Sequence, residues 1–136
     1  MNRAYVDANV IVRLITGDPP EMADQAERLF RRADEGGLEF VVDSIVIAEV
    51  VWVLSSFYGF TPDEIAPTLQ TLLVSDGIVG EEKLESLQAL ALYHEKHIDF
   101  VDALLSVRMM REGVRVIYSF DRHFDRLDSI RRVVPS

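Results

Sequence analysis

The sequence predicts an α/β fold in which helices cover both faces of a parallel sheet. Short apolar runs of strand length alternate with segments of helical length along the 136 residues. Two of the apolar runs are followed by an acidic residue, Asp7 or Asp121, at the carboxyl end of a strand, where such sheets bind ligands. An apolar share of 49% is enough for a hydrophobic core.

The first half of the chain is expected to contain two strands and four helices. Asn9 and Ser44 are expected to cap two of the helices, and Thr61 with Glu64 has the spacing of a capping box. The helix that begins at Ser44 is nearly all apolar, so we expect it to be buried on most sides. The predicted strands are 4–6 and 38–42, and the predicted helices are 9–16, 21–33, 44–57 and 61–74.

The second half continues the alternation of strands and helices. Asp99 is expected to cap a helix over 100–112, which Gly113 ends. The other predictions are a third short strand at 77–79, a helix over 81–96, a strand over 114–119, a helical turn over 122–127 and a final edge strand at 132–134.

The charge of the chain is acidic overall but unevenly distributed. The net charge of −9 argues against unspecific binding to nucleic acid, which needs cationic side chains. Residues 1–100 carry 7 basic and 18 acidic side chains, and residues 101–136 carry 7 basic and 5 acidic ones. Of the 14 basic residues 12 are arginine, which suits bidentate phosphate contacts. Two interpretations stay open for the basic end: a phosphate-binding surface, or weak ion pairs on solvated helices.

Cysteine usage and hydropathy indicate the compartment. The absence of cysteine excludes disulfides and thiolate metal sites. No uncharged stretch of 18 residues suggests a membrane span, and Asp7 interrupts the N-terminal apolar run that a signal peptide would need. We therefore expect a soluble cytoplasmic protein.

Four carboxylates, Asp7, Glu49, Asp102 and Asp121, lie in or beside apolar runs. An ionised carboxylate is costly to bury without a partner, and two of them about 5 Å apart repel by roughly 3 kcal/mol at an effective dielectric constant near 20. If the four acids converge, a divalent cation relieves this repulsion. Oxygen ligands without histidine or cysteine favour Mg²⁺, with Mn²⁺ as a substitute.

Each acid also has a purely structural interpretation. Asp7 and Asp121 can serve as turn or capping residues after a strand, and Asp102 as an acidic residue in the first turn of a helix. Asp99 fits a helix cap better than a ligand, and Asp125 fits an exposed turn. Glu49 is the hardest acid to explain structurally, because its helix is apolar around it.

Taken together, these residues resemble the PIN-domain family, and more narrowly the VapC-type toxin ribonucleases of toxin–antitoxin pairs. The resemblance runs in order over the whole chain, 1–136, and implies one PIN-like nuclease domain with a three-layer α/β/α sandwich and a mostly parallel sheet. The stretches that carry it are Tyr5-Val6-Asp7-Ala8-Asn9-Val10-Ile11, Ile47-Ala48-Glu49-Val50, Asp99-Phe100-Val101-Asp102-Ala103-Leu104 and Ser119-Phe120-Asp121.

The resemblance further implies a Mg²⁺-dependent endoribonuclease that works as a homodimer and is neutralised by an antitoxin. By position, Asp7, Glu49, Asp102 and Asp121 would form the catalytic and metal-binding quartet, with Asp7 and Asp102 as the most direct ligands. Asn9 and Ser119 match supporting polar positions. Asp99 and Asp125 match positions that are often acidic in the family, so their roles stay open.

A metal-activated water would then hydrolyse the RNA phosphodiester without a protein nucleophile. His94, His97 and His123 are candidates for proton transfer by composition alone, and the first two are more typical of a polar helix end. Two rival interpretations remain. A phospho-acceptor receiver domain needs a lysine after a late strand, which Lys83 and Lys96 do not supply. A PIN-like binding module would cleave nothing.

Four aromatic residues close together in sequence are candidates for a dimer or antitoxin surface. Burial in the core is an equally good interpretation for the tryptophan. The four are Trp52, Phe57, Tyr58 and Phe60.

Overall fold

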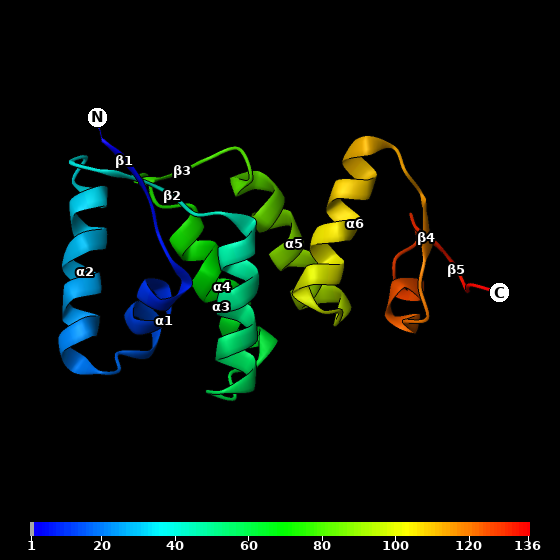
Figure 1. Cartoon of the computed structure of the whole chain (residues 1–136), viewed down its shortest axis with the longest axis horizontal. Coiled ribbons are helices and arrows are strands. Elements are labelled where there is room, and N and C mark those ends of the chain that lie inside the picture. The colour runs from blue at the N-terminus through cyan, green and yellow to red at the C-terminus, as the bar shows by residue number, and fades with distance from the viewer. Residues whose placement is uncertain (1) are drawn as a thin grey trace.

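The predicted α/β class is confirmed by a computed structural model, which describes residues 2–136 (Figure 1). Helices alternate with strands, and each of the three strand pairings is parallel. In chain order the elements are β1 (Arg3–Tyr5), α1 (Ala8–Thr16), α2 (Pro20–Asp34), β2 (Glu39–Val41), α3 (Ser44–Ser56), α4 (Pro62–Leu73), β3 (Ile78–Val79), α5 (Lys83–Lys96), α6 (Phe100–Glu112), β4 (Val116–Tyr118), the 3₁₀ helix η1 (Arg122–Arg126) and β5 (Arg131–Val133).

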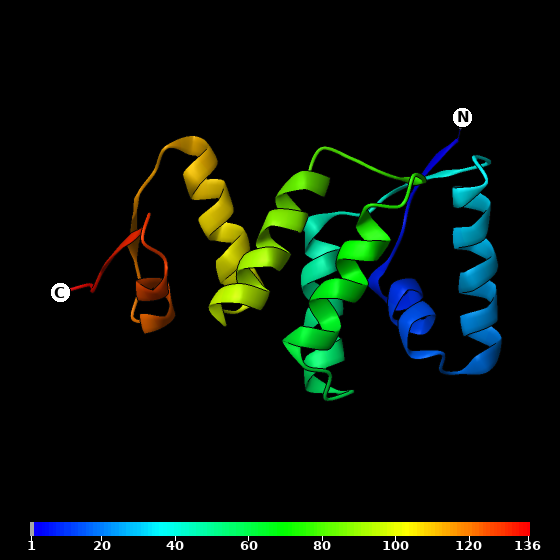
Figure 2. The same cartoon turned by 180° about the vertical axis from the view of Figure 1, so that it is seen from behind.

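The five strands form two sheets. Strands β1, β2 and β3 make one sheet in that order, with Ala4 opposite Phe40 and Phe40 opposite Ile78. Strands β4 and β5 pair with each other, with Ile117 opposite Arg132. In Figures 1 and 2 this second sheet stands at one end of the molecule, and α5 and α6 lie between it and the first sheet. The division was not anticipated from the sequence.

The hydrophobic core lies mainly between the helices and the three-stranded sheet. Ile11, Ile47, Leu54, Leu69 and Leu90 have no exposed surface. Close packing also explains Gly77, because a Cβ atom built there would lie 2.6 Å from the Cβ atom of Ala33 at the end of α2.

Two of the predicted N-caps are shifted by one or two residues. Asp7, and not Asn9, is the N-cap of α1, and Asn9 lies exposed within the first turn. Asp43, and not Ser44, caps α3 by accepting a hydrogen bond from the Ile45 amide at 2.9 Å. The Asp43 carboxylate therefore satisfies a free amide of α3, whereas Asp7 occupies the N-cap position of α1 without a side-chain capping hydrogen bond. The capping box of Thr61 and Glu64 is confirmed.

The prediction that the helix around Glu49 is buried on most sides is wrong. Ile47, Val50 and Leu54 are buried, but Glu49 is exposed, as are Ile45 at 75% and Trp52 at 58%. Residues three and four positions apart lie on one face of a helix, so α3 has an apolar outer face that the described residues leave uncovered. Phe57 is also exposed and stacks edge-on against Trp52.

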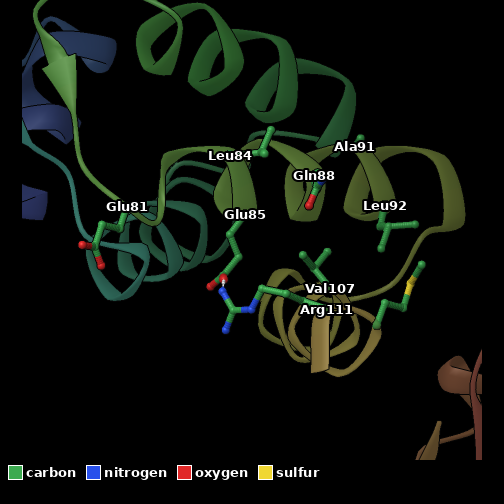
Figure 3. Close-up of a pocket in the computed structure, with 9 residues that line it drawn as sticks. Glu81, Leu84, Glu85, Gln88, Ala91, Leu92, Val107 and Arg111 are labelled. Carbon is green, nitrogen blue, oxygen red and sulfur yellow. Dashed lines mark hydrogen bonds and ion pairs between the residues drawn. The ribbon is translucent and has the colours of Figure 1, made fainter. Parts of the chain in front are cut away.

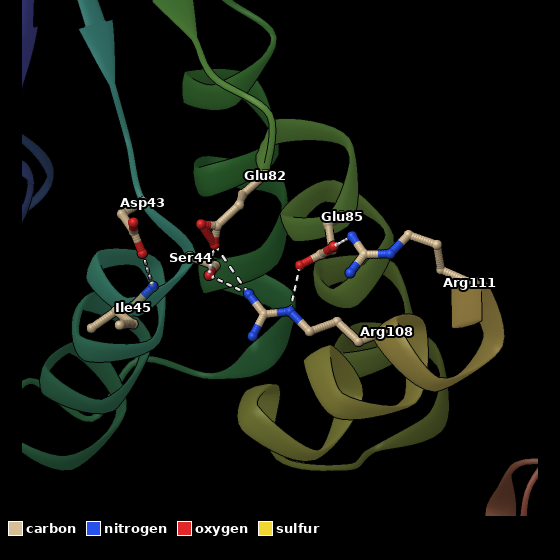
Figure 4. A network of polar contacts seen from close by, with 7 residues as sticks. All are labelled: Asp43, Ser44, Ile45, Glu82, Glu85, Arg108 and Arg111. Carbon is tan, nitrogen blue, oxygen red and sulfur yellow. Dashed lines mark hydrogen bonds and ion pairs between the residues drawn. The ribbon is translucent and has the colours of Figure 1, made fainter. Parts of the chain in front are cut away.

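A network of charged side chains fixes α6 against the rest of the molecule (Figure 4). Arg108 of α6 donates to Glu85 of α5 at 2.5 Å, to the hydroxyl of Ser44 at 2.8 Å and to Glu82 at 3.1 Å. Arg111 donates to the other oxygen of Glu85. The Glu85 side chain is only 6% exposed, so its charge depends on these two arginines.

Within residues 2–136, no helix has the length and apolar character needed to cross a membrane.

We expect Arg108→Ala to lower the free energy of unfolding by about 2 kcal/mol, because it removes a partner of the buried Glu85 carboxylate while Arg111 remains. Arg31→Ala is the matched control. It breaks an exposed ion pair with Glu27 on α2 and should cost at most about 0.5 kcal/mol. Urea unfolding followed by circular dichroism measures both values. Equal losses in the two variants would contradict the structural role of the network.

Candidate acidic site

Asp7 and Glu49 face a common cleft. Asp7 follows β1 and begins α1, and Glu49 lies in the middle of α3, so the short strand and the two helices bring the carboxylates together. The cleft has a volume of about 490 Å³, and both acids are exposed to solvent. Its lining comprises Asp7, Ala8, Asn9, Val12, Arg13, Glu49, Val53, Phe57 and Tyr58. The predicted supporting residue Asn9 is therefore beside the first acid.

Arg13 is a member of this cleft that the sequence did not single out. Its guanidinium donates to the Asp18 carbonyl at 3.2 Å and to the Tyr58 hydroxyl at 3.4 Å, and neither Asp7 nor Glu49 forms an ion pair with it. Its position four residues after Asn9 places both on one face of α1, which was the available signal. A fixed guanidinium beside two carboxylates can contact a phosphate.

Asp102 and Asp121 form a second pair of acids. Asp102 lies in the first turn of α6, and Asp121 follows β4 and caps η1. Burial raises the pKa of the Asp102 carboxyl, and the nearby charges of Asp121 and Asp99 raise it further. A hydrogen bond with the Asp121 side chain acts in the same direction, while His123 lowers the pKa.

The loop after β4 is held by local hydrogen bonds. The amide of Asp121 donates to the Ser119 hydroxyl, and the amide of His123 donates to the Asp121 carboxylate, both at 2.9 Å. Ser119 thus positions the last acid of the predicted set. His123 Nδ1 lies 3.3 Å from the Asp121 carboxylate. By contrast, His94 pairs with Asp63, and His97 is an exposed residue at the end of α5.

Asp99 and Asp102 line a cleft of about 510 Å³ on a different side of α3. Its walls include Ala48 and Trp52 of α3. Glu49, the residue after Ala48, lines the first cleft instead. Asp99 is the N-cap residue of α6 as predicted, although its side chain forms no capping hydrogen bond. Helix α3 therefore stands between the two pairs of acids.

Most of the arginines in the basic C-terminal third are occupied by contacts within the chain. Arg132 makes two hydrogen bonds of 3.0 Å to Asp125, and this pairing lowers the pKa of the exposed Asp125 carboxyl. Arg126 donates to the backbone carbonyls of Lys96 and His97. These contacts favour ion pairing over phosphate binding for this part of the chain.

The four acids do not converge in a single chain. Among residues 2–136, no group of three or more histidine, cysteine, aspartate or glutamate side chains is arranged to hold a metal ion. The donor chemistry of the acids suits Mg²⁺, and each pair of carboxylates would supply part of a ligand set for the ion. The physical reason is that β4, which Asp121 follows, pairs with β5 in a sheet apart from β1.

A further cleft of about 660 Å³ lies between α5 and α6 (Figure 3). Its lining is mostly apolar, from Leu84, Leu92, Val107 and Met110 among others. Glu85 is its one deeply buried acid and is neutralised by Arg108 and Arg111. None of the four predicted acids lines it.

The chain is similar in sequence to known proteins. The profile of the PIN domain family matches residues 4–130. The chain is also 27% identical over 122 residues to a protein named VapC ribonuclease from Aquifex aeolicus (strain VF5), and the alignment covers 90% of each chain.

We expect Asp102→Asn to stabilise the metal-free protein at pH 7 by about 0.5–1 kcal/mol, the size of a screened contact between like charges. A raised pKa means that the folded state binds the proton more tightly than the unfolded state does. Ionisation of Asp102 therefore costs stability as the pH rises above the ordinary carboxyl range, and the gain should vanish as the pH approaches 3. Thermal unfolding from pH 3 to 8 tests this, with the exposed Asp128→Asn as control. A gain that does not depend on pH would refute it.

Proposed function

The chain belongs to the PIN-domain family, and on that basis we propose that it is a Mg²⁺-dependent endoribonuclease, the toxin of a toxin–antitoxin pair. The observation that carries the proposal is the pairing of Asp7 with Glu49 in one cleft and of Asp102 with Asp121 beside α6. The name of the relative from Aquifex aeolicus supports RNA as the substrate. Membership of the family also accords with the α/β/α class predicted from the sequence.

The acids would provide the hard oxygen ligands of the cofactor. A bound Mg²⁺, or Mn²⁺ in its place, supplies polarisation of the phosphate and a bound water of lowered pKa. In the chain itself, Asp7 and Glu49 are open to solvent and so accessible to a polynucleotide. Two ionised carboxylates repel a phosphate, and the fixed guanidinium of Arg13 in the same cleft offsets part of that repulsion.

The partners of this proposal are RNA, a second copy of the chain and an antitoxin. An antitoxin that contributes a cationic side chain would be attracted to the carboxylates of Asp7 and Glu49. The aromatic side chains of Phe57 and Tyr58 line the same cleft and offer it an apolar contact. Activity of this kind acts on cytoplasmic RNA.

One observation favours a second candidate function, a PIN-like binding module without catalysis. Among the described residues, no three potential metal ligands lie close together. This is expected of a module that does not bind a metal ion. Titration with Mn²⁺ distinguishes the two, because a catalytic protein must bind the ion and the binding module need not.

We expect Asp7→Asn to lower the cleavage rate about 100-fold or more while the protein stays folded. Even residues that only support the ligands of a metal site typically contribute about 10–100-fold. Asp7 is exposed and its side chain makes no capping hydrogen bond, so the fold does not need its charge. Hydrolysis of a fluorogenic RNA measures the rate, and Asp24→Asn on the exposed face of α2 serves as control. Loss of the circular dichroism signal in metal-free buffer would instead indicate a structural role.

The cleavage products test the type of reaction. Hydrolysis by an activated water should leave a 5′-phosphate on the downstream fragment, and EDTA should abolish cleavage until Mg²⁺ or Mn²⁺ is added in excess. A mechanism based on a pair of histidines would leave a 2′,3′-cyclic phosphate and would not respond to EDTA. Sequencing of RNA ends after expression of the protein identifies the products, and cyclic ends would exclude the proposal.

A further inference from the structure

Strands β1 and β4 each form one outer edge of a sheet, and β3 and β5 form the opposite edges. Strand β1 pairs only with β2, and β4 pairs only with β5, among the strands of residues 2–136. Free edges of strands are usually short, charged or covered, because their backbone groups otherwise pair with another chain. The front and back views show β4 and β1 on opposite sides of the α5–α6 pair, so these edges do not meet in one chain (Figures 1 and 2).

Large apolar side chains stand exposed on β1 and on or just after β4. Tyr5 of β1 is 73% exposed, and Tyr118 of β4 and the following Phe120 are 71% and 75% exposed. The outer face of α3, with Ile45 and Trp52, is a further exposed apolar surface. Aromatic residues on a strand normally face a neighbouring layer, so their exposure here indicates that a layer is missing.

The chain has little freedom to bring its own β4 to its own β1. Only residues 113–115 connect α6 to β4, and three residues span at most about 11 Å. Helix α6 is fixed by the contacts of Arg108 with Ser44 and Glu85, and Arg126 ties η1 to the end of α5. Closure within one chain would break these contacts, whereas a second copy offers the same edge with all of them intact.

We propose that two copies of the chain exchange their C-terminal strands, so that β4 of each copy pairs in parallel with β1 of the other. Asp7 lies two residues after β1 and Asp121 three residues after β4, so parallel pairing brings the carboxyl ends of both strands to one edge. Each Asp7–Glu49 pair is then completed by the Asp102–Asp121 pair of the second copy. The meaning of this shared site for catalysis rests on the proposed function.

The charge distribution favours the same occupant. Residues 1–100 carry a balance of −11 and residues 101–136 one of +2. The exchanged strands therefore come from the less acidic end of one copy and approach the more acidic part of the other, which favours their encounter.

Chemical cross-linking tests the exchange independently of any activity. The chain has no cysteine, so the double variant Tyr5→Cys/Tyr118→Cys introduces the only two thiols, both at exposed positions. With a short bismaleimide at low protein concentration, we expect the products on a denaturing gel to be covalent dimers. Val74→Cys/Tyr118→Cys is the matched control, since Val74 is 59% exposed at the end of α4, and it should give several-fold less dimer.

Two outcomes would overturn the exchange. A cross-link that forms within one chain, giving a modified monomer, would mean that β4 reaches β1 of its own copy. A wild-type protein that light scattering shows to be monomeric at micromolar concentration would exclude the second copy altogether. Circular dichroism of each variant confirms that it is folded before the reaction.

Complementation between inactive variants tests whether the site is shared. Asp7→Asn and Asp121→Asn chains are unfolded together, refolded as a mixture and assayed on RNA. Half of the exchanged dimers would contain one chain of each kind, and one of their two sites would have all four acids. We therefore expect about one quarter of the wild-type activity from the mixture and none from either variant alone.

A mixture that stays inactive, beside an active wild-type protein, would overturn the shared site. A wild-type protein without activity would count against the proposed function, and the cross-linking result would still decide the exchange. The two hypotheses can thus fail separately.

Discussion

The buried carboxylate of Glu85 is the constraint on which the arrangement of the C-terminal half depends. A charge with so little access to water needs cationic partners, and the chain supplies them from α6 through Arg108 and Arg111. Because Arg108 also reaches Ser44 at the start of α3, the same contacts set the position of α6 relative to α3. These contacts position α6 and therefore Asp102. They also set how far the Asp102–Asp121 pair lies from the Asp7–Glu49 pair.

Electrostatic repulsion opposes a close approach of the four acids. Convergence of all four carboxylates would concentrate like charge in a small volume, and the pKa of Asp102 is already raised by burial and by its neighbours Asp121 and Asp99. Two separate pairs, one of them open to solvent, limit this repulsion. A bound cation would offset the repulsion between the two pairs. The position of the second sheet, which places Asp121, therefore determines whether the four acids can share a cation.

Local signals in the sequence were sufficient for most of the elements. The helix over 100–112, with Asp99 before it and Gly113 after it, matches α6 residue for residue, because caps and breakers act over a few neighbouring residues. Signals that depend on distant residues were not sufficient. The apolar composition around Glu49 suggested burial, yet whether a face of α3 is covered depends on the placement of segments that are distant in sequence. The positions of the acids were readable from motifs, whereas their grouping depends on contacts between segments remote in sequence.

The unpaired edge of β1 has a consequence for dosage. A reaction centre assembled from two molecules is scarce when the molecules are dilute, and below the dissociation constant its amount rises with the square of their concentration. Under the proposed function, low expression would then give little active dimer, and a modest surplus over an antitoxin would raise the activity steeply. The concentration at which activity rises would then be set by how strongly the edge of β1 binds β4 of a second copy.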